Sequence, residues 1–126
     1  MKILNQVFDA LEILHSVGYT HNDLKASNIM LDFDLNATLI DLGFTSSFLD
    51  KDTKQMKPIS TLKCFRGNIL FSSVNQMKFL STSPADDLKS FCYLMLTLLN
   101  TGEFPIIDEN ANSDELDDKK YFKKVK

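Results

Sequence analysis

The sequence predicts a mainly helical fold of the α+β class with one small β-hairpin. Apolar residues recur every three or four positions from residue 2 to about residue 16, which is the pattern of an amphipathic helix. Residues 85–99 are apolar with almost no polar face, so we expect a buried central helix there. Between these helices, the short apolar runs 28–31 and 38–40 flank a turn-prone segment, and this arrangement predicts the hairpin.

The composition is that of an ordinary soluble domain. The chain has 126 residues, with 14 Lys+Arg against 17 Asp+Glu and a formal net charge of −3. This slight acid excess gives no reason to expect nucleic acid or an anionic membrane as a partner. No apolar stretch approaches the roughly 18–20 residues of a spanning helix, and the N-terminus lacks the apolar core of a signal peptide. We therefore expect a cytoplasmic or nuclear protein that is not secreted.

Three features outside the helices and the hairpin lead to further expectations. The 45–83 segment shows little periodicity and carries several lysines, and a loop of this length usually serves function or is disordered. Residues 108–126 hold six acids followed by five lysines, which predicts a charged C-terminal segment. Cys64 and Cys92 lack the spacing of metal ligands, so we interpret them as buried or inert thiols.

The stretch most informative about chemistry reads His-Asn-Asp-Leu-Lys-Ala-Ser-Asn over residues 21–28, and Asp-Leu-Gly follows at residues 41–43. It resembles the protein-kinase catalytic loop H-R-D-L-K-x-x-N and the metal-binding loop D-F-G. Asn28 lies five residues after Asp23, and Asp41 lies 13 residues after Asn28, as expected for that family. Five matching residue types in eight positions, followed by a hairpin and an acid-x-Gly, make this a specific signal.

The residue types in this stretch suit phosphoryl transfer, which depends mainly on positioning and on neutralising charge. Asp23 can orient a substrate hydroxyl and accept its proton, and Lys25 can place a cation against the γ-phosphate of ATP. Mg²⁺ prefers oxygen ligands, so Asn28 and Asp41 are the predicted metal ligands and thereby also hold the nucleotide. By resemblance to the family, Met30 forms the lower wall of the adenine site.

Two further residues are expected to have supporting roles. Gly43 is expected to let the backbone after Asp41 adopt a conformation that a Cβ disfavours. His21 is expected to pack against the Asp41 loop and to take no part in catalysis.

The downstream sequence narrows the resemblance to the casein kinase one group and its vaccinia-related cousins. Residues 65–75 look like their G-T-x-x-[YF]-x-S-[IV]-[ND] segment, and residues 86–93 look like their D-D-L-E-S-L-G-Y segment. In that alignment Asp87 is a buried acid that accepts backbone hydrogen bonds from the catalytic loop.

Three residues depart from the family pattern. Asn22 stands where most members have Arg, so an activation-loop phosphate cannot be clamped through that side chain. Asn68 replaces a Thr that bonds the catalytic Asp and Lys, and Leu70 replaces an Arg used for phosphorylated substrates. The last departure puts recognition of such substrates in doubt.

The resemblance implies a partial protein kinase domain over residues 1–126. It runs from the helix before the catalytic loop through the helix after the central helix. Residues 45–83 are then the activation segment, and residues 108–126 are the charged C-terminal segment. The implied fold is a kinase-like C-terminal lobe, with the N-terminal lobe absent from this sequence.

We therefore expect a serine/threonine protein kinase of the casein kinase one group, which uses ATP and Mg²⁺ to phosphorylate Ser or Thr of a protein substrate. Activity should be impaired, because the sequence holds no Gly-rich loop and no paired strand lysine. One alternative is a non-catalytic interaction module or pseudokinase fragment that binds a protein partner on the exposed upper face of the lobe. A small-molecule phosphotransferase is a further alternative, but Lys25, Gly43 and the 86–88 helix start argue against it.

Overall fold

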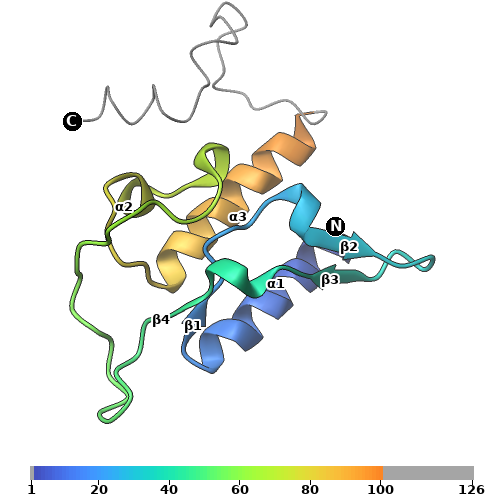
Figure 1. Cartoon of the computed structure of the whole chain (residues 1–126). Coiled ribbons are helices and arrows are strands. Elements are labelled where there is room, and N and C mark those ends of the chain that lie inside the picture. Colours follow the sequence, from blue (N-terminus) through green and yellow to red (C-terminus); the bar gives the residue numbers. More distant parts are fainter. Residues whose placement is uncertain (1, 101–126) are drawn as a thin grey trace, which may run out of the picture. The chain divides into compact units, whose positions relative to one another are not determined.

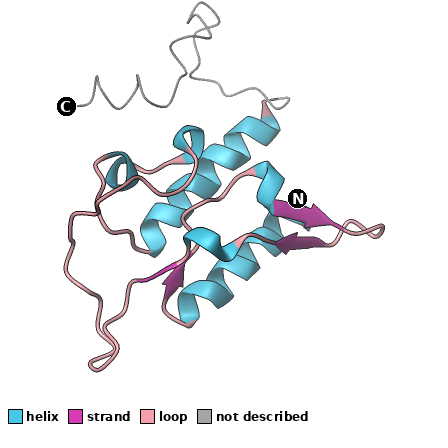
Figure 2. Ribbon diagram, viewed as in Figure 1, coloured by secondary structure: helices cyan, strands magenta, loops and turns pink. Residues whose placement is uncertain are grey.

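The computed structural model describes residues 2–100, and Figures 1 and 2 show how their elements are arranged. The chain divides into two units, residues 1–95 and 96–126, and the candidate site lies in the first. Short 3₁₀-helices are labelled η. In chain order the elements are α1 (Lys2–Ser16), β1 (Tyr19–Thr20), η1 (Ala26–Asn28), β2 (Ile29–Leu31), β3 (Ala37–Leu39), η2 (Leu42–Phe44), β4 (Ser46–Ser47), η3 (Ile69–Phe71), α2 (Val74–Met77) and α3 (Pro84–Leu99).

The first predicted helix is confirmed as α1. Its buried residues are Val7 and Leu11, which are four positions apart and therefore share one face. Gly18 follows with a φ of +89°, a left-handed conformation that a glycine adopts without steric cost. The helix consequently ends before Gly18, and the chain continues into β1.

The central helix is confirmed as α3, but it is buried on one side only. Its buried residues are Asp86, Asp87, Ser90, Phe91 and Leu94. Two positions expected to be buried are exposed, since Leu88 is 38% exposed and Leu98 is 45% exposed. The buried side meets α1, where the ring centroids of Phe8 and Phe91 lie 5.8 Å apart. The apolar composition of this helix therefore predicted more burial than the structure shows.

The hydrophobic core joins α1, α3 and the 21–28 loop. Its buried members are Val7, Leu11, Leu24, Phe91 and Leu94. Leu24 lies between Asp23 and Lys25 in the sequence, and burying a leucine side chain contributes about 1.5–3 kcal/mol. The core thus holds the loop that carries the candidate site.

Two separate two-stranded sheets flank the 21–28 loop (Figure 1). The predicted hairpin is confirmed as antiparallel β2 and β3, with Ile29 opposite Leu39. A second small sheet was not predicted: β1 and β4, which are far apart in the sequence, also pair antiparallel, with Thr20 opposite Ser46. Each of these strands has two residues, which is too short to show an alternating pattern.

The 45–83 segment is built from short ordered pieces (Figure 2). Isolated bridges join Leu49 to Met56 and Thr61 to Leu80. At the start of α2, Ser73 and Gln76 form a capping box, in which each side chain bonds the other residue's backbone N–H. This Ser-x-x-Gln pattern is a sequence signal for the helix that the periodicity did not show.

Two other expectations have different outcomes. Of the two alternatives given for the cysteines, burial is wrong, because Cys64 and Cys92 are both exposed, and both are free thiols. The predicted charged segment 108–126 lies outside the described residues. Within residues 2–100, none of the helices is long and apolar enough to span a membrane.

The loop between β2 and β3 holds an exposed carboxylate, Asp32, whose pKa is lowered. Asp32 accepts hydrogen bonds from the backbone N–H (2.8 Å) and the side-chain amide (2.8 Å) of Asn36 and from the backbone N–H of Asp34 (2.9 Å). These bonds hold the pKa of Asp32 below its ordinary 3.8, and the bonds from Asn36 have the largest effect. A lowered folded-state pKa stabilises the loop above the unfolded-state pKa, and this contribution is lost as the pH falls through the lowered value.

We therefore expect an NMR titration of the Asp32 carboxyl to give a midpoint below 3.8. Protection of the Asn36 amide from hydrogen exchange should fall over the same acid range. Asp32→Asn should remove that pH dependence. A midpoint at or above the ordinary value would contradict this assignment.

Candidate active site

The 21–28 loop gathers three of the predicted site residues in direct contact. Lys25 Nζ lies 2.8 Å from Asp23 Oδ2. The side-chain amide of Asn28 donates to the same Oδ2 (2.9 Å) and to the backbone carbonyl of Asp23 (2.7 Å). One oxygen of the Asp23 carboxylate is therefore held by a cation and an amide.

The other carboxylate oxygen of Asp23 has no partner. Oδ1 is the one buried side-chain N or O atom in residues 2–100 without a hydrogen bond, and the side chain as a whole is 1% exposed. Leaving a buried polar atom unpaired costs about 1–3 kcal/mol, more for a charged group. Such an atom in a native fold calls for a functional explanation. The geometry leaves this oxygen available to accept a hydrogen bond or a proton.

Asp41 is positioned through the residue before it. The Ile40 N–H donates to the backbone carbonyl of Asn28 (2.9 Å), and the carbonyl of Ile40 lies 3.2 Å from Nε2 of His21. Asp41 therefore follows a residue that is bonded to both ends of the 21–28 loop. His21 contacts the Asp41 loop in the way the sequence predicted.

The expected role of Gly43 is wrong. The left-handed conformation belongs to Asp41 itself, with φ 62° and ψ 76°, whereas Gly43 has no positive φ. The Asp41 side chain accepts from the N–H of Gly43 at 3.2 Å. This local bond compensates for the strained backbone, since Asp tolerates the left-handed region better than most residues.

The predicted site residues do not all touch one another. Asp41 is exposed, and among the described residues no hydrogen bond or ion pair joins it to Asp23, Lys25 or Asn28. Met30 lies on β2 opposite Thr38 and is 60% exposed. Residues 23, 25 and 28 thus form the contact cluster, while residue 30 lies on the adjoining hairpin and residue 41 follows it.

Asn28 and Asp41 each keep an oxygen atom of the type that magnesium prefers as a ligand. The Asn28 amide nitrogen is used by Asp23, which leaves the amide oxygen of Asn28 without a hydrogen bond within residues 2–100. Asp41 keeps one carboxylate oxygen beyond its bond to Gly43. Mg²⁺ takes oxygen ligands and usually keeps several waters, so two protein oxygens suffice.

Asp87 anchors the 21–28 loop to the start of α3. Its carboxylate accepts from the backbone N–H of His21 (2.7 Å) and of Asn22 (2.9 Å), as predicted. His15, near the end of α1, adds a third contact, with Nε2 2.8 Å from Asp87 Oδ2. The sequence carried no sign of this role for His15, because nothing in an amphipathic helix pattern marks one polar residue as the partner of a buried carboxylate.

The two departures in the 45–83 segment have local roles. The Asn68 side chain accepts from the N–H of Leu70 at 2.9 Å and so caps η3. Leu70 is 39% exposed. Among the described contacts, neither residue bonds Asp23 or Lys25.

Comparison with known proteins identifies the family of this chain. The protein kinase domain pattern matches residues 1–125. A "probable casein kinase I homolog" of Encephalitozoon cuniculi (strain GB-M1) is 27% identical over 107 residues, which is 85% of this chain and 33% of that protein. The serine/threonine-protein kinase spe-6 of Caenorhabditis elegans is 30% identical over 125 residues, or 95% of this chain and 32% of that protein.

The chain spans about a third of the length of these two relatives. The match to the domain pattern, in contrast, covers nearly every residue, including the whole contact cluster. This chain belongs to the protein kinase family.

Proposed function

We propose that this chain carries the phosphate-transferring part of a serine/threonine protein kinase of the casein kinase one type. The observation that supports this most is the buried, unpaired Oδ1 of Asp23. In the proposed step, a Ser or Thr hydroxyl oxygen bonds to the γ-phosphorus of ATP while the bond to the ADP oxygen breaks. The hydroxyl proton passes to Asp23 Oδ1, and this transfer needs an oxygen atom that is free to accept it.

The neighbouring residues supply charge and orientation. Lys25 is held by Asp23 yet its side chain is 28% exposed, so its cation can also meet the γ-phosphate. Asn28 and Asp41 would hold Mg²⁺, which neutralises phosphate charge when bound. Met30 is exposed on β2 and would lie under the adenine ring.

The casein kinase assignment within the family is part of the proposal. It is supported by the printed name of the Encephalitozoon relative and by the 86–88 start of α3, where both acids are buried. Protein substrates with Ser or Thr hydroxyls follow from the same assignment.

The 126-residue polypeptide on its own should be a poor catalyst. It holds four glycines and no Gly-rich loop, the element that covers the phosphates of ATP in protein kinases. Positioning errors near 1 Å can cost about a hundredfold in rate. We expect millimolar ATP binding, about −4 kcal/mol, because most of the usual buried ligand surface is missing.

We expect an NMR titration with Mg–ATP to shift amides at residues 23–28 and 41–43 first. Asp41→Asn should weaken the Mg²⁺-dependent binding of ATP several-fold, because the asparagine amide lacks the charge that attracts the ion. Asp34→Asn, the same change in the hairpin loop, is the matched control and should leave the titration unaltered. Shifts spread evenly over the chain, or absent at the 21–28 loop, would contradict the proposed site.

In a transfer assay with a casein-like peptide, the purified chain should stay near background, and Asp23→Asn should change little. A rate of about 1–100 per second that Asp23→Asn abolishes would contradict the expected impairment while supporting the proposed chemistry. The two parts of the proposal are thus separable.

A non-catalytic interaction module is the second candidate. It is favoured by large apolar side chains left exposed on the hairpin and beyond Asp41: Met30, Leu31, Phe33, Leu42 and Phe44. Exposed apolar surface of this kind often marks a protein contact. A folded chain that gives no Mg–ATP response at the 21–28 loop would favour this candidate over the catalytic one.

A further inference from the structure

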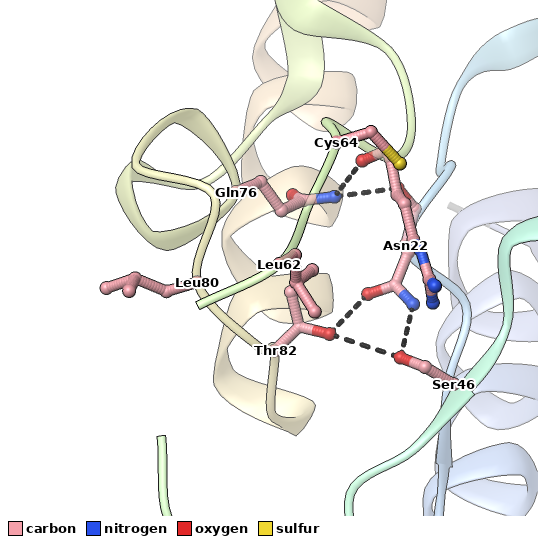
Figure 3. Close-up of a pocket in the computed structure, with 8 residues that line it drawn as sticks. Asn22, Ser46, Leu62, Cys64, Gln76, Leu80 and Thr82 are labelled. Atoms are coloured by element: carbon pink, nitrogen blue, oxygen red, sulfur yellow. Dashed lines mark hydrogen bonds between the residues drawn. The ribbon is translucent and has the colours of Figure 1, made fainter. Parts of the chain in front are cut away.

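The Asn22 side chain uses its amide nitrogen and its amide oxygen to bond two distant parts of the chain. Its nitrogen donates to the carbonyl of Phe44 (2.8 Å) and to the hydroxyl oxygen of Ser46 (2.8 Å). Its oxygen accepts from the hydroxyl of Thr82 at 2.6 Å. Figure 3 shows Asn22 between Ser46 and Thr82 in a small pocket.

The backbone of Asn22 is held equally closely. Its carbonyl accepts from the side-chain amide of Gln76 (2.8 Å), which also bonds the carbonyl of Arg66 (3.1 Å). Gly67 passes so near that a Cβ there would lie 2.1 Å from the Asn22 carbonyl oxygen. The backbone N–H donates to Asp87. Asn22 is 4% exposed, so water does not compete for these bonds.

These contacts join the two ends of the 45–83 segment through one residue. Phe44 directly precedes the segment and Ser46 lies at its beginning, whereas Gln76 and Thr82 lie near its end. Ser46 and Thr82 also approach each other (3.5 Å), and both contact the buried hydroxyl of Thr20. The Asn22 amide, together with the Thr20 hydroxyl, thus joins both ends of the segment beside the 21–28 loop.

Asparagine suits this position for two physical reasons. Its φ is 70°, and Asn enters the left-handed region at less cost than most residues. Its amide also combines donors and an acceptor without a charge that burial would penalise. The titratable or charged groups near it are Asp87, which binds its N–H, and Cys64 and Arg66, which line the pocket.

We propose that Asn22 is a positioning residue that holds the 45–83 segment closed onto the 21–28 loop by neutral hydrogen bonds. The order of the segment then requires no phosphate or other anion beside residue 22. Calling this segment an activation segment rests on the proposed function, but the hydrogen-bonded closure does not. If the closure proposal fails, the hydrogen exchange of the 45–83 segment will show it, whatever the outcome of the Mg–ATP titration.

The test is Asn22→Asp in the full 126-residue chain, followed by amide hydrogen exchange. At pH 7–8 a carboxylate would face the Phe44 carbonyl and the Ser46 hydroxyl oxygen. We expect exchange over residues 44–49 and 76–82 to rise about tenfold to a hundredfold, since an unpaired buried group is costly. As the pH falls through the pKa of the introduced carboxyl group, the neutral acid can donate again, and exchange corrected for its intrinsic rate should return toward that of the native chain.

Asn5→Asp on the exposed face of α1 is the matched control, because it makes the same substitution where Asn has no side-chain bond among the described contacts. It should show neither the rise nor its reversal with pH. Equal exchange in Asn22→Asp and Asn5→Asp would overturn the proposal.

Two further arms keep the result decisive. If Asn22→Asp unfolds the chain, Thr82→Val replaces it, because valine has nearly the shape of threonine but lacks the hydroxyl that donates to Asn22. Exchange should then rise about three- to tenfold over residues 44–49 and 76–82 alone. No rise would overturn the proposal. Inorganic phosphate added to the native chain should leave the segment's exchange unchanged. Protection by phosphate would show that the pocket is an anion site and would also overturn it.

Discussion

Asp87→Asn is expected to destabilise the chain by roughly 2–4 kcal/mol, because it leaves buried backbone donors facing an amide nitrogen. The native carboxylate accepts from two backbone N–H groups, those of His21 and Asn22, and contacts His15 as well. An asparagine has one acceptor oxygen of similar placement, so at least one of these donors loses its partner. Residues 21 and 22 are buried, and water cannot replace the lost bond.

The measurement is denaturant unfolding, followed by exchange at the amides of residues 21 and 22. Asp9→Asn on the exposed face of α1 removes the same charge where the structure describes no partner, and should stay within about 0.5 kcal/mol. Equal unfolding free energies for the two variants would refute the anchoring role of Asp87.

Gly67→Ala is expected to cost about 3 kcal/mol or more. The φ of Gly67 is +106°, a region that an alanine occupies only under strain. The added Cβ would lie 2.1 Å from the carbonyl oxygen of Asn22 and 3.2 Å from its carbonyl carbon. Both atoms belong to the backbone of Asn22, whose carbonyl oxygen accepts from Gln76 and whose N–H donates to Asp87, so they cannot move aside without breaking other bonds.

Gly43→Ala is the matched control for that substitution. Gly43 has no positive φ, and an added Cβ would meet only the Asp41 carboxylate oxygen, at 3.1 Å. A side-chain oxygen can shift by a few tenths of an ångström, so we expect a loss below about 1 kcal/mol. If calorimetry gave Gly43→Ala the larger loss of the two, the close approach of Gly67 to Asn22 would not be the source of strain.

The regular elements were predictable where the sequence pattern is local. α1 and α3 appear in the apolar spacing over 15 and 16 residues, and the β2–β3 hairpin appears in two runs separated by a turn. The β1–β4 sheet was missed because its register joins residues 19–20 to 46–47 across a long stretch of chain. Two residues per strand carry no periodic signal.

Predictions about individual side chains depended on what surrounds them. The motif named Asp23, Lys25 and Asn28, and the structure places these three in contact. It could not say which residue near Asp41 takes the left-handed backbone, because Asp and Gly both tolerate it. Leu88 looked like a core residue from its type alone, and yet it lies on the open side of α3.

The sequence by itself determined the local elements and the order of the chemical groups, because helix periodicity, turns and motif spacing act over a few neighbouring residues. Tertiary structure alone decided that His15 contacts Asp87, and that Asn22 joins both ends of the 45–83 segment. These contacts join residues that are 22 to 72 positions apart in the sequence. Their partners are chosen by burial, since a polar group removed from water must bond whichever group the packing of α1 against α3 brings within reach.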